Sequence, residues 1–162
     1  PPTCIDSSKS YSAVVETNRG SFTIALDPTL APGAVNNFVF LARYHFYDGL
    51  DFYRVVPGTM VATGKLPPPN REDGGYRIDE ELPPDRSAYV PGAVLMDNDG
   101  PNTDSGAFMV LTTDQPIAPK FTVFGNVTEG LDTTIAAIES TGNGGGAPTE
   151  PTIVSRITVT ES

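Results

Sequence analysis

The sequence has little cysteine, histidine or positive charge, and each shortage narrows what the protein can be. Its 162 residues include one cysteine, Cys4, and one histidine, His45. One cysteine cannot close a disulfide within the chain, and a zinc site needs several Cys or His ligands at short spacings. A hydrolytic triad needs a serine or cysteine nucleophile beside the histidine, and no such setting is recognisable. We therefore expect no metal site and no cofactor.

Acidic residues outnumber the basic ones. The chain has 10 Lys and Arg residues against 20 Asp and Glu, which gives a formal net charge of −10. Nucleic acid and anionic lipid are held mainly by cationic side chains, so we expect neither as a partner. The apolar runs also fall far short of the roughly 20 residues that cross a bilayer. We expect no membrane contact by this segment, and we interpret the acidity as a source of solubility.

The N-terminus leaves two interpretations of Cys4 open. The chain begins with Pro1 instead of methionine, so we expect that any targeting segment lies upstream. Cys4 then either pairs with a cysteine of that upstream part, as in a secreted protein, or is a free thiol on a loose tail. The sequence does not favour one over the other.

Glycine and proline, at 16 residues each, indicate a chain with many turns. The length suits one domain with a sizeable core, and we predict a tail over residues 1–10 and one domain over residues 11–162. Short or alternating apolar runs between turn residues predict strands. They cover Tyr11–Thr17, Ser21–Leu26, Phe52–Val56, Met60–Thr63, Ala93–Met96, Ala107–Leu111, Val123–Thr128 and Val154–Thr160.

Two segments have the apolar spacing of helices. The first begins after Ala31, where Pro32 suits a first turn, and its apolar residues recur at the i, i+3, i+4 and i+7 positions that begin at Val35. The second is Leu131–Glu139. Loops are predicted at Leu66–Gly75 and Thr141–Pro148. Many short strands with two helices fit a β-barrel and a β-sandwich equally well.

Two motifs decide between these architectures. Phe52–Gly64 reads FYRVVPGTMVATG, and Gly100–Val110 reads GPNTDSGAFMV. Together they resemble the two halves of the active groove of cyclophilins. The resemblance extends over nearly the whole chain, because three further segments fall in that family's order and spacing. These are Val14–Leu26, Ala34–Gly49 and Phe121–Asp132.

The resemblance implies a mainly β fold, namely a closed eight-stranded antiparallel β-barrel capped by two α-helices. It also implies a peptidyl-prolyl cis-trans isomerase that acts on proline-containing peptides or unfolded proteins. We expect a monomer of the bacterial extracytoplasmic type, anchored at the cell surface or secreted. The second hypothesis is a module on the same scaffold that binds proline segments or another partner without turning them over.

The chemistry of this family needs no nucleophile. Rotation about an Xaa-Pro bond must break amide resonance, which costs about 18–20 kcal/mol. A guanidinium that donates a hydrogen bond to the prolyl nitrogen as it pyramidalises lowers that barrier, because the bond exists only in the twisted state. By resemblance, Arg54 occupies the position of the catalytic arginine of cyclophilins. A solvent-facing arginine on a strand is the alternative, and the surrounding motif favours the catalytic role.

By resemblance, the proline ring would lie in an apolar pocket. We expect Phe108, next to it, to belong to the core. Asn98 matches a family asparagine whose backbone contacts the peptide. The expected substrate-binding residues are Met60, Asn98, Met109, Ile117 and Phe121, together with Thr59, Ala62 and Ala107 at altered positions.

Several groove positions depart from the family pattern. Thr59 replaces an aromatic residue, Ala62 and Ala107 replace glutamines, and Phe121 replaces a histidine. Asp97 replaces a small residue, and we expect it either to pair with Arg54 or to repel acidic peptides. Loss of the glutamine at Ala62 removes a residue that orients the arginine, and loss of the aromatic removes apolar area worth about 1–2 kcal/mol. The sequence therefore predicts weakened isomerase activity.

Overall fold

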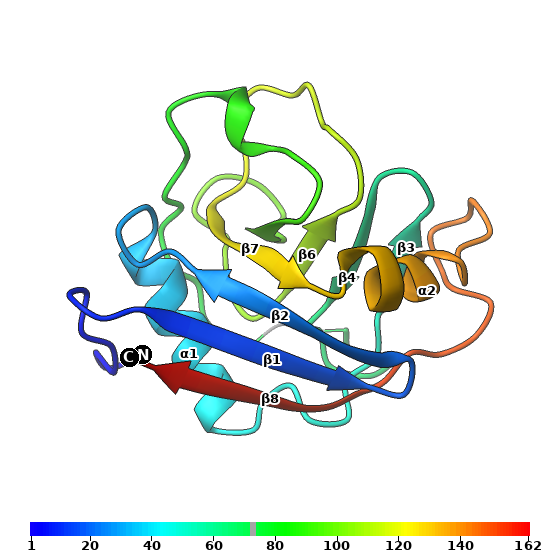
Figure 1. Cartoon of the computed structure of the whole chain (residues 1–162), viewed down its shortest axis with the longest axis horizontal. Coiled ribbons are helices and arrows are strands. Elements are labelled where there is room, and N and C mark those ends of the chain that lie inside the picture. The colour runs from blue at the N-terminus through cyan, green and yellow to red at the C-terminus, as the bar shows by residue number, and fades with distance from the viewer. Residues whose placement is uncertain (72–73) are drawn as a thin grey trace.

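In the computed structural model, which describes residues 1–71 and 74–162, one antiparallel sheet curls around the core (Figure 1). Its eight strands lie in the order β3-β4-β6-β5-β7-β2-β1-β8. The chain order of the elements is as follows: β1 (Tyr11–Thr17), β2 (Gly20–Leu26), α1 (Pro32–Arg43), β3 (Arg54–Val56), β4 (Met60–Thr63), η1 (Arg86–Ala88), β5 (Ala93–Met96), β6 (Phe108–Leu111), β7 (Val123–Glu129), η2 (Leu131–Ile135), α2 (Ala136–Glu139) and β8 (Val154–Glu161).

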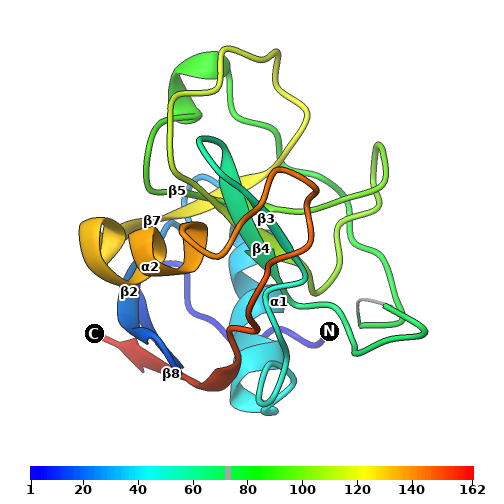
Figure 2. The same cartoon turned by 90° about the vertical axis from the view of Figure 1, so that its right-hand side faces the viewer.

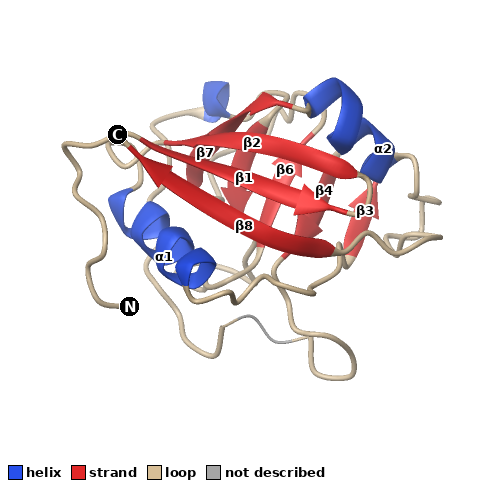
Figure 3. Cartoon of the chain, turned by 60° about the horizontal axis from the view of Figure 1, so that its bottom comes forward, coloured by secondary structure: helices blue, strands red, loops and turns tan. Residues whose placement is uncertain are grey.

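The mainly β fold with two helices is confirmed, but the expectation of a closed barrel is overstated. The sheet is a curled half-barrel whose edge strands are β3 and β8 (Figure 3). Just before these strands the two edges meet at a bridge between Asp51 and Ile153. Backbone hydrogen bonds beside it run from Phe52 N–H to Thr152 O at 2.9 Å and from Val154 N–H to Leu50 O at 2.8 Å. Beyond that bridge the Gly-rich loop Thr141–Pro148 lies between β3 and β8. Gly146 O of this loop accepts a hydrogen bond from the outward N–H of Val55 at 2.7 Å. This loop, not β8, covers the edge of β3.

The two helices lie toward opposite ends of the curled sheet (Figures 1 and 2). Helix α1 has Pro32 at its start and buries Val35, Phe38, Val39 and Ala42, as the spacing predicts. The second helical segment also lies where it was predicted. Its first part is a π-helical turn, in which Ile135 N–H donates to Gly130 O at 2.9 Å.

Strand alternation builds two apolar layers. Inward side chains join those of α1 in the main core, where the rings of Phe38, Tyr47, Phe108 and Phe124 pack together. Phe108 is thus a core residue, as expected. On the other face of β4, β5 and β6 lies a second, smaller apolar cluster, and it underlies the candidate site. This outer cluster contains Met60, Ala62, Tyr89, Ala93, Leu95, Met109, Leu111 and Val123.

The first ten residues have no helix or strand, yet they pack on the domain. The backbone N–H of Cys4 donates to Asn36 Oδ1 on α1 at 2.7 Å, and Cys4 and Ile5 are half-buried against the core. Residues 72 and 73 of the predicted loop Leu66–Gly75 lie outside the described residues. Among the helices described, none is long and apolar enough to cross a bilayer.

Candidate active site

A small pocket opens on the outer cluster beside Arg54. Its volume is about 140 Å³. Apolar cavities of about 150 Å³ accept a benzene-sized ring, so this pocket has room for the ring of a proline. Its lining is Arg54, Thr59, Met60, Leu95, Asp97, Met109, Leu111, Gln115, Ile117 and Phe121.

The floor of the pocket follows from strand register. Met60 on β4 lies opposite Leu111 on β6, and Leu95 on β5 lies opposite Met109. Side chains alternate between the two faces of a strand, so Met109 and Leu111 share one face while Phe108 and Val110 point to the main core. A slip of one residue in β6 would exchange the two sets.

Arg54 is the first residue of edge strand β3, and its side chain is exposed at the side of the pocket. Its backbone lies opposite Ala62 of β4. Within the described part of the chain, the guanidinium has no hydrogen-bond or ion-pair partner. Among these residues, therefore, none fixes its direction, and it can donate to a ligand.

The pocket brings together six of the nine residues expected to act on a substrate. Three lie outside its lining. Ala62 and Ala107 are fully buried, and neither reaches the pocket. Asn98 directs its side-chain amide to Asp104 Oδ1 at 3.0 Å and to Lys120 O at 3.3 Å. The six in the pocket are Arg54, Thr59, Met60, Met109, Ile117 and Phe121.

Asp97 has a different partner from the one considered in the sequence. The ion pairs found among the described residues do not include Arg54 with Asp97. Instead, the hydroxyl of Tyr53 donates to Asp97 Oδ2. Tyr53 immediately precedes Arg54, and Lys65 Nζ lies 5.1 Å from the centre of its ring. The Tyr53–Asp97 contact ties the start of β3 to the end of β5.

Four residues that shape the pocket were not among the predicted site residues. Leu95 and Leu111 line the pocket. They lie on the same face of the sheet as Met109, so the alternation of side chains along β5 and β6 could have predicted them. Gln115 also lines it, from an irregular segment that has no periodic signal. The Tyr53 hydroxyl joins residues 44 positions apart, so local pattern gave no sign of it.

A buried polar network supports the loop that carries Asn98. Asp104 is fully buried and accepts hydrogen bonds from Asn98 Nδ2 at 3.0 Å and from Thr122 Oγ1 at 2.7 Å. Burial raises the pKa of the Asp104 carboxyl, the two hydrogen bonds oppose that rise, and Glu80 and Glu81 add to it. The carboxyl is therefore easier to protonate than an exposed aspartate.

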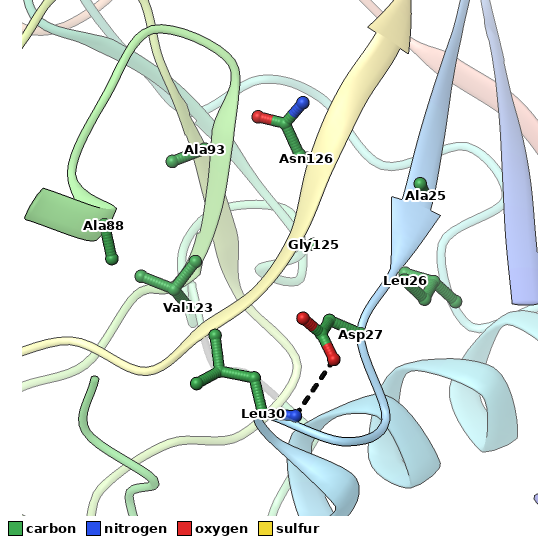
Figure 4. Close-up of a pocket in the computed structure, with 9 residues that line it drawn as sticks. All are labelled: Ala25, Leu26, Asp27, Leu30, Ala88, Ala93, Val123, Gly125 and Asn126. Atoms are coloured by element: carbon green, nitrogen blue, oxygen red, sulfur yellow. Dashed lines mark hydrogen bonds between the residues drawn. The ribbon is translucent and has the colours of Figure 1, made fainter. Parts of the chain in front are cut away.

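A larger pocket of about 370 Å³ lies near the start of α1 (Figure 4). Its one acid, among the described residues that line it, is Asp27, which accepts from the backbone N–H groups of Thr29 at 3.1 Å and Leu30 at 2.9 Å. This carboxylate therefore stabilises the turn that leads into α1. The described lining has no cation, so the smaller pocket beside Arg54 is the candidate site.

One protein family matches most of the chain. The family model described as cyclophilin type peptidyl-prolyl cis-trans isomerase/CLD matches residues 12–159. The chain belongs to the cyclophilin family. The cyclophilin match therefore spans almost the whole domain, from β1 to β8.

Relatives in two kingdoms are similar to this cyclophilin. The probable peptidyl-prolyl cis-trans isomerase A of Mycobacterium leprae is 32% identical over 165 residues, which cover 91% of each chain. The peptidyl-prolyl cis-trans isomerase-like 1 of Gibberella zeae is 35% identical and covers 74% of this chain and 76% of its own. A crystal structure of a Cryptosporidium parvum cyclophilin superposes with a TM-score of 0.84 at 22% identity, covering 93% of this chain and 98% of that one. This last likeness supports the fold.

Proposed function

We propose that this cyclophilin catalyses the cis-trans isomerisation of Xaa-Pro bonds in peptides and in folding proteins. One observation carries the proposal: Arg54, which has no partner among the described residues, stands beside an apolar pocket the size of a proline ring. The family membership and the names of the relatives support it.

The geometry suggests how the reaction would proceed. The proline ring enters the pocket over Met60, Met109 and Phe121, where apolar contact holds it still. The acyl side of the bond then rotates in the open groove. As conjugation is lost, the prolyl nitrogen becomes pyramidal and basic, and Arg54 donates a hydrogen bond to it. This bond is strongest at the top of the barrier of about 18–20 kcal/mol, so it stabilises the transition state selectively.

We also propose that the activity is weak. Thr59 gives the pocket less apolar area than an aromatic residue would, and Ala62 contributes no amide toward Arg54. A catalytic group with an unfixed direction loses rate, and a displacement of about 1 Å can cost about a hundredfold. Proline-containing peptides and unfolded chains are the ligands we propose.

The second candidate function is proline-peptide binding without turnover. The absence of an orienting partner for Arg54 within the described residues favours it, because binding needs the pocket while catalysis also needs a placed donor.

NMR exchange spectroscopy on the tetrapeptide Ala-Ala-Pro-Phe separates the two functions. The cis and trans signals give the exchange rate, and shift changes of the protein give the affinity from the same sample. An isomerase raises the exchange rate in proportion to its concentration. Saturable shifts around Met60 and Met109 without faster exchange would establish the binding module. If neither the rate nor the shifts changed, both functions would be excluded.

A further inference from the structure

Asp97 is an unusual residue for the wall of a proline pocket. Its side chain lines the pocket, and the residue is 8% exposed. Most of the neighbouring lining is apolar, including Leu95, Met109 and Phe121. A carboxylate in such surroundings is unfavourable unless hydrogen bonds compensate for lost hydration. Hydrophobic contact with a proline ring does not require an acid here.

Two contacts hold Asp97 in place. Its backbone N–H donates to Ala107 O at 3.0 Å, which fixes the residue at the end of β5. The Tyr53 hydroxyl donates to Oδ2, which fixes the direction of the carboxylate. The tyrosine is itself flanked by Lys65, whose Nζ lies 5.1 Å from the ring centre. The acid is therefore an ordered part of the pocket wall.

The other oxygen of Asp97 is left for a ligand. Oδ1 accepts no hydrogen bond from the described residues. Every buried side-chain polar atom among these residues has a hydrogen-bond partner, so Oδ1, which has none, is accessible from the surface. Of the described residues lining the pocket, Asp97 is the one acid and Arg54 the one base. They do not form an ion pair, so the pocket presents two separate and opposite charges.

We propose that Asp97, oriented by Tyr53, determines specificity: it favours substrates with a lysine or arginine next to the proline and disfavours those with an acid there. This inference rests on the proposed function and adds the substrate class. Arg54 addresses the prolyl nitrogen, which every substrate has. Asp97 addresses the neighbouring side chain, whose charge differs between substrates. The net charge of −10 adds a weaker attraction for cationic chains.

The effect of one charge pair in a partly dry pocket is moderate. Exposed ion pairs contribute little, whereas partial shielding from water strengthens them. We expect peptides with Lys next to proline to be turned over about tenfold faster than those with Glu, which corresponds to about 1.4 kcal/mol. Added salt should reduce this ratio, since screening weakens the interaction.

The test compares peptides of the form Ala-Xaa-Pro-Phe and Ala-Pro-Xaa-Phe, with Lys, Ala or Glu at Xaa. For each, NMR exchange gives the catalysed rate and a shift titration gives the affinity. The variant Asp97→Asn keeps an acceptor for Tyr53 and removes the charge. The matched control is Asp99→Asn, because Asp99 is exposed, two residues away and outside the pocket lining.

We expect the Lys-to-Glu ratio to fall from about ten to near one in Asp97→Asn and to stay near ten in Asp99→Asn. A ratio equal in the wild type and Asp97→Asn, or a wild-type preference for Glu, would overturn the assignment. The ratio is insensitive to a change in rate common to all peptides. If no peptide is turned over, the isomerase proposal fails, and the ratio of affinities still decides the role of Asp97.

Discussion

Glu139 Oε2 lies 3.0 Å from the backbone nitrogen of Gly58, so α2 holds the turn between β3 and β4. The same carboxylate also accepts the hydroxyl of Thr112, just beyond β6. The turn connects the strand of Arg54 to the strand of Met60. One acid thus joins α2 to the β3–β4 turn and to the end of β6, and we regard Glu139 as a positioning residue for the site.

The variant Glu139→Ala should affect both stability and activity. Gly58 N–H and Thr112 would lose their common acceptor, so the free energy of unfolding should fall by about 1–2 kcal/mol in a urea titration. The looser turn should lower kcat/KM on an Xaa-Pro peptide on the order of tenfold. Glu129→Ala, an exposed acid at the end of β7, is the control. Unchanged kcat/KM in Glu139→Ala would show that the turn keeps its position without this clamp.

A second acid stabilises α1 from outside the helix. The carboxylate of Glu81 accepts the backbone N–H groups of Gly33 at 3.0 Å and Ala34 at 2.9 Å, and Ala31 provides no side-chain cap. Glu81→Ala should therefore reduce the free energy of unfolding by about 1–2 kcal/mol. Urea unfolding measures it, with the exposed Asp79→Ala as a control. Equal losses in the two variants would mean that the cap contributes nothing specific.

The buried Asp104 should make stability depend on pH. Burial raises the pKa of its carboxyl in the folded state. The neutral acid is then favoured by folding, so its contribution to stability is complete below the unfolded pKa of about 3.9 and is lost as pH rises through the folded pKa. Asp104→Asn should thus be more stable than the wild type at pH 7, with a difference that shrinks toward pH 4. Urea midpoints at the two pH values measure this. A variant that is equally destabilised at both would show that the hydrogen bonds of the carboxylate outweigh its desolvation.

Restoring an aromatic side chain at the pocket should strengthen substrate binding. Thr59 lines the pocket and is half-buried, so a phenylalanine there would add apolar contact with the proline ring. Thr59→Phe should lower the peptide Kd or KM about 5- to 30-fold, which corresponds to about 1–2 kcal/mol. Weaker binding in this variant would indicate that the new ring fills the pocket and excludes the proline. Thr158→Phe, on an exposed residue of β8 outside the lining, is the control.

Periodicity predicted the parts of this fold that depend on one face being buried. The alternation in Tyr11–Thr17 and the spacing from Val35 to Ala42 placed β1 and α1 correctly, because each segment buries a single face. The two groove motifs placed Arg54, Met60 and Met109 around one pocket, since register in the sheet leaves few alternatives.

Contacts between distant irregular segments could not be predicted in this way. The Tyr53–Asp97 bond and the Asn98–Asp104–Thr122 network depend on how loops cross, and loops have no repeating pattern. The open edge was missed for a similar reason. Whether β3 meets β8 or the loop at Gly146 depends on backbone geometry around the Gly-rich segment, where side-chain pattern gives little information.

The central claim is that the Arg54 guanidinium stabilises the twisted Xaa-Pro bond. Measuring kcat/KM for Ala-Ala-Pro-Phe with the wild type, Arg54→Ala and Arg54→Lys tests it most directly. Arg156→Ala, an exposed cation on β8, is the control for net charge. We expect a loss of about a hundredfold in Arg54→Ala, little recovery in Arg54→Lys because lysine lacks the planar fork of donors, and no change in Arg156→Ala. Full activity in Arg54→Ala would contradict the account.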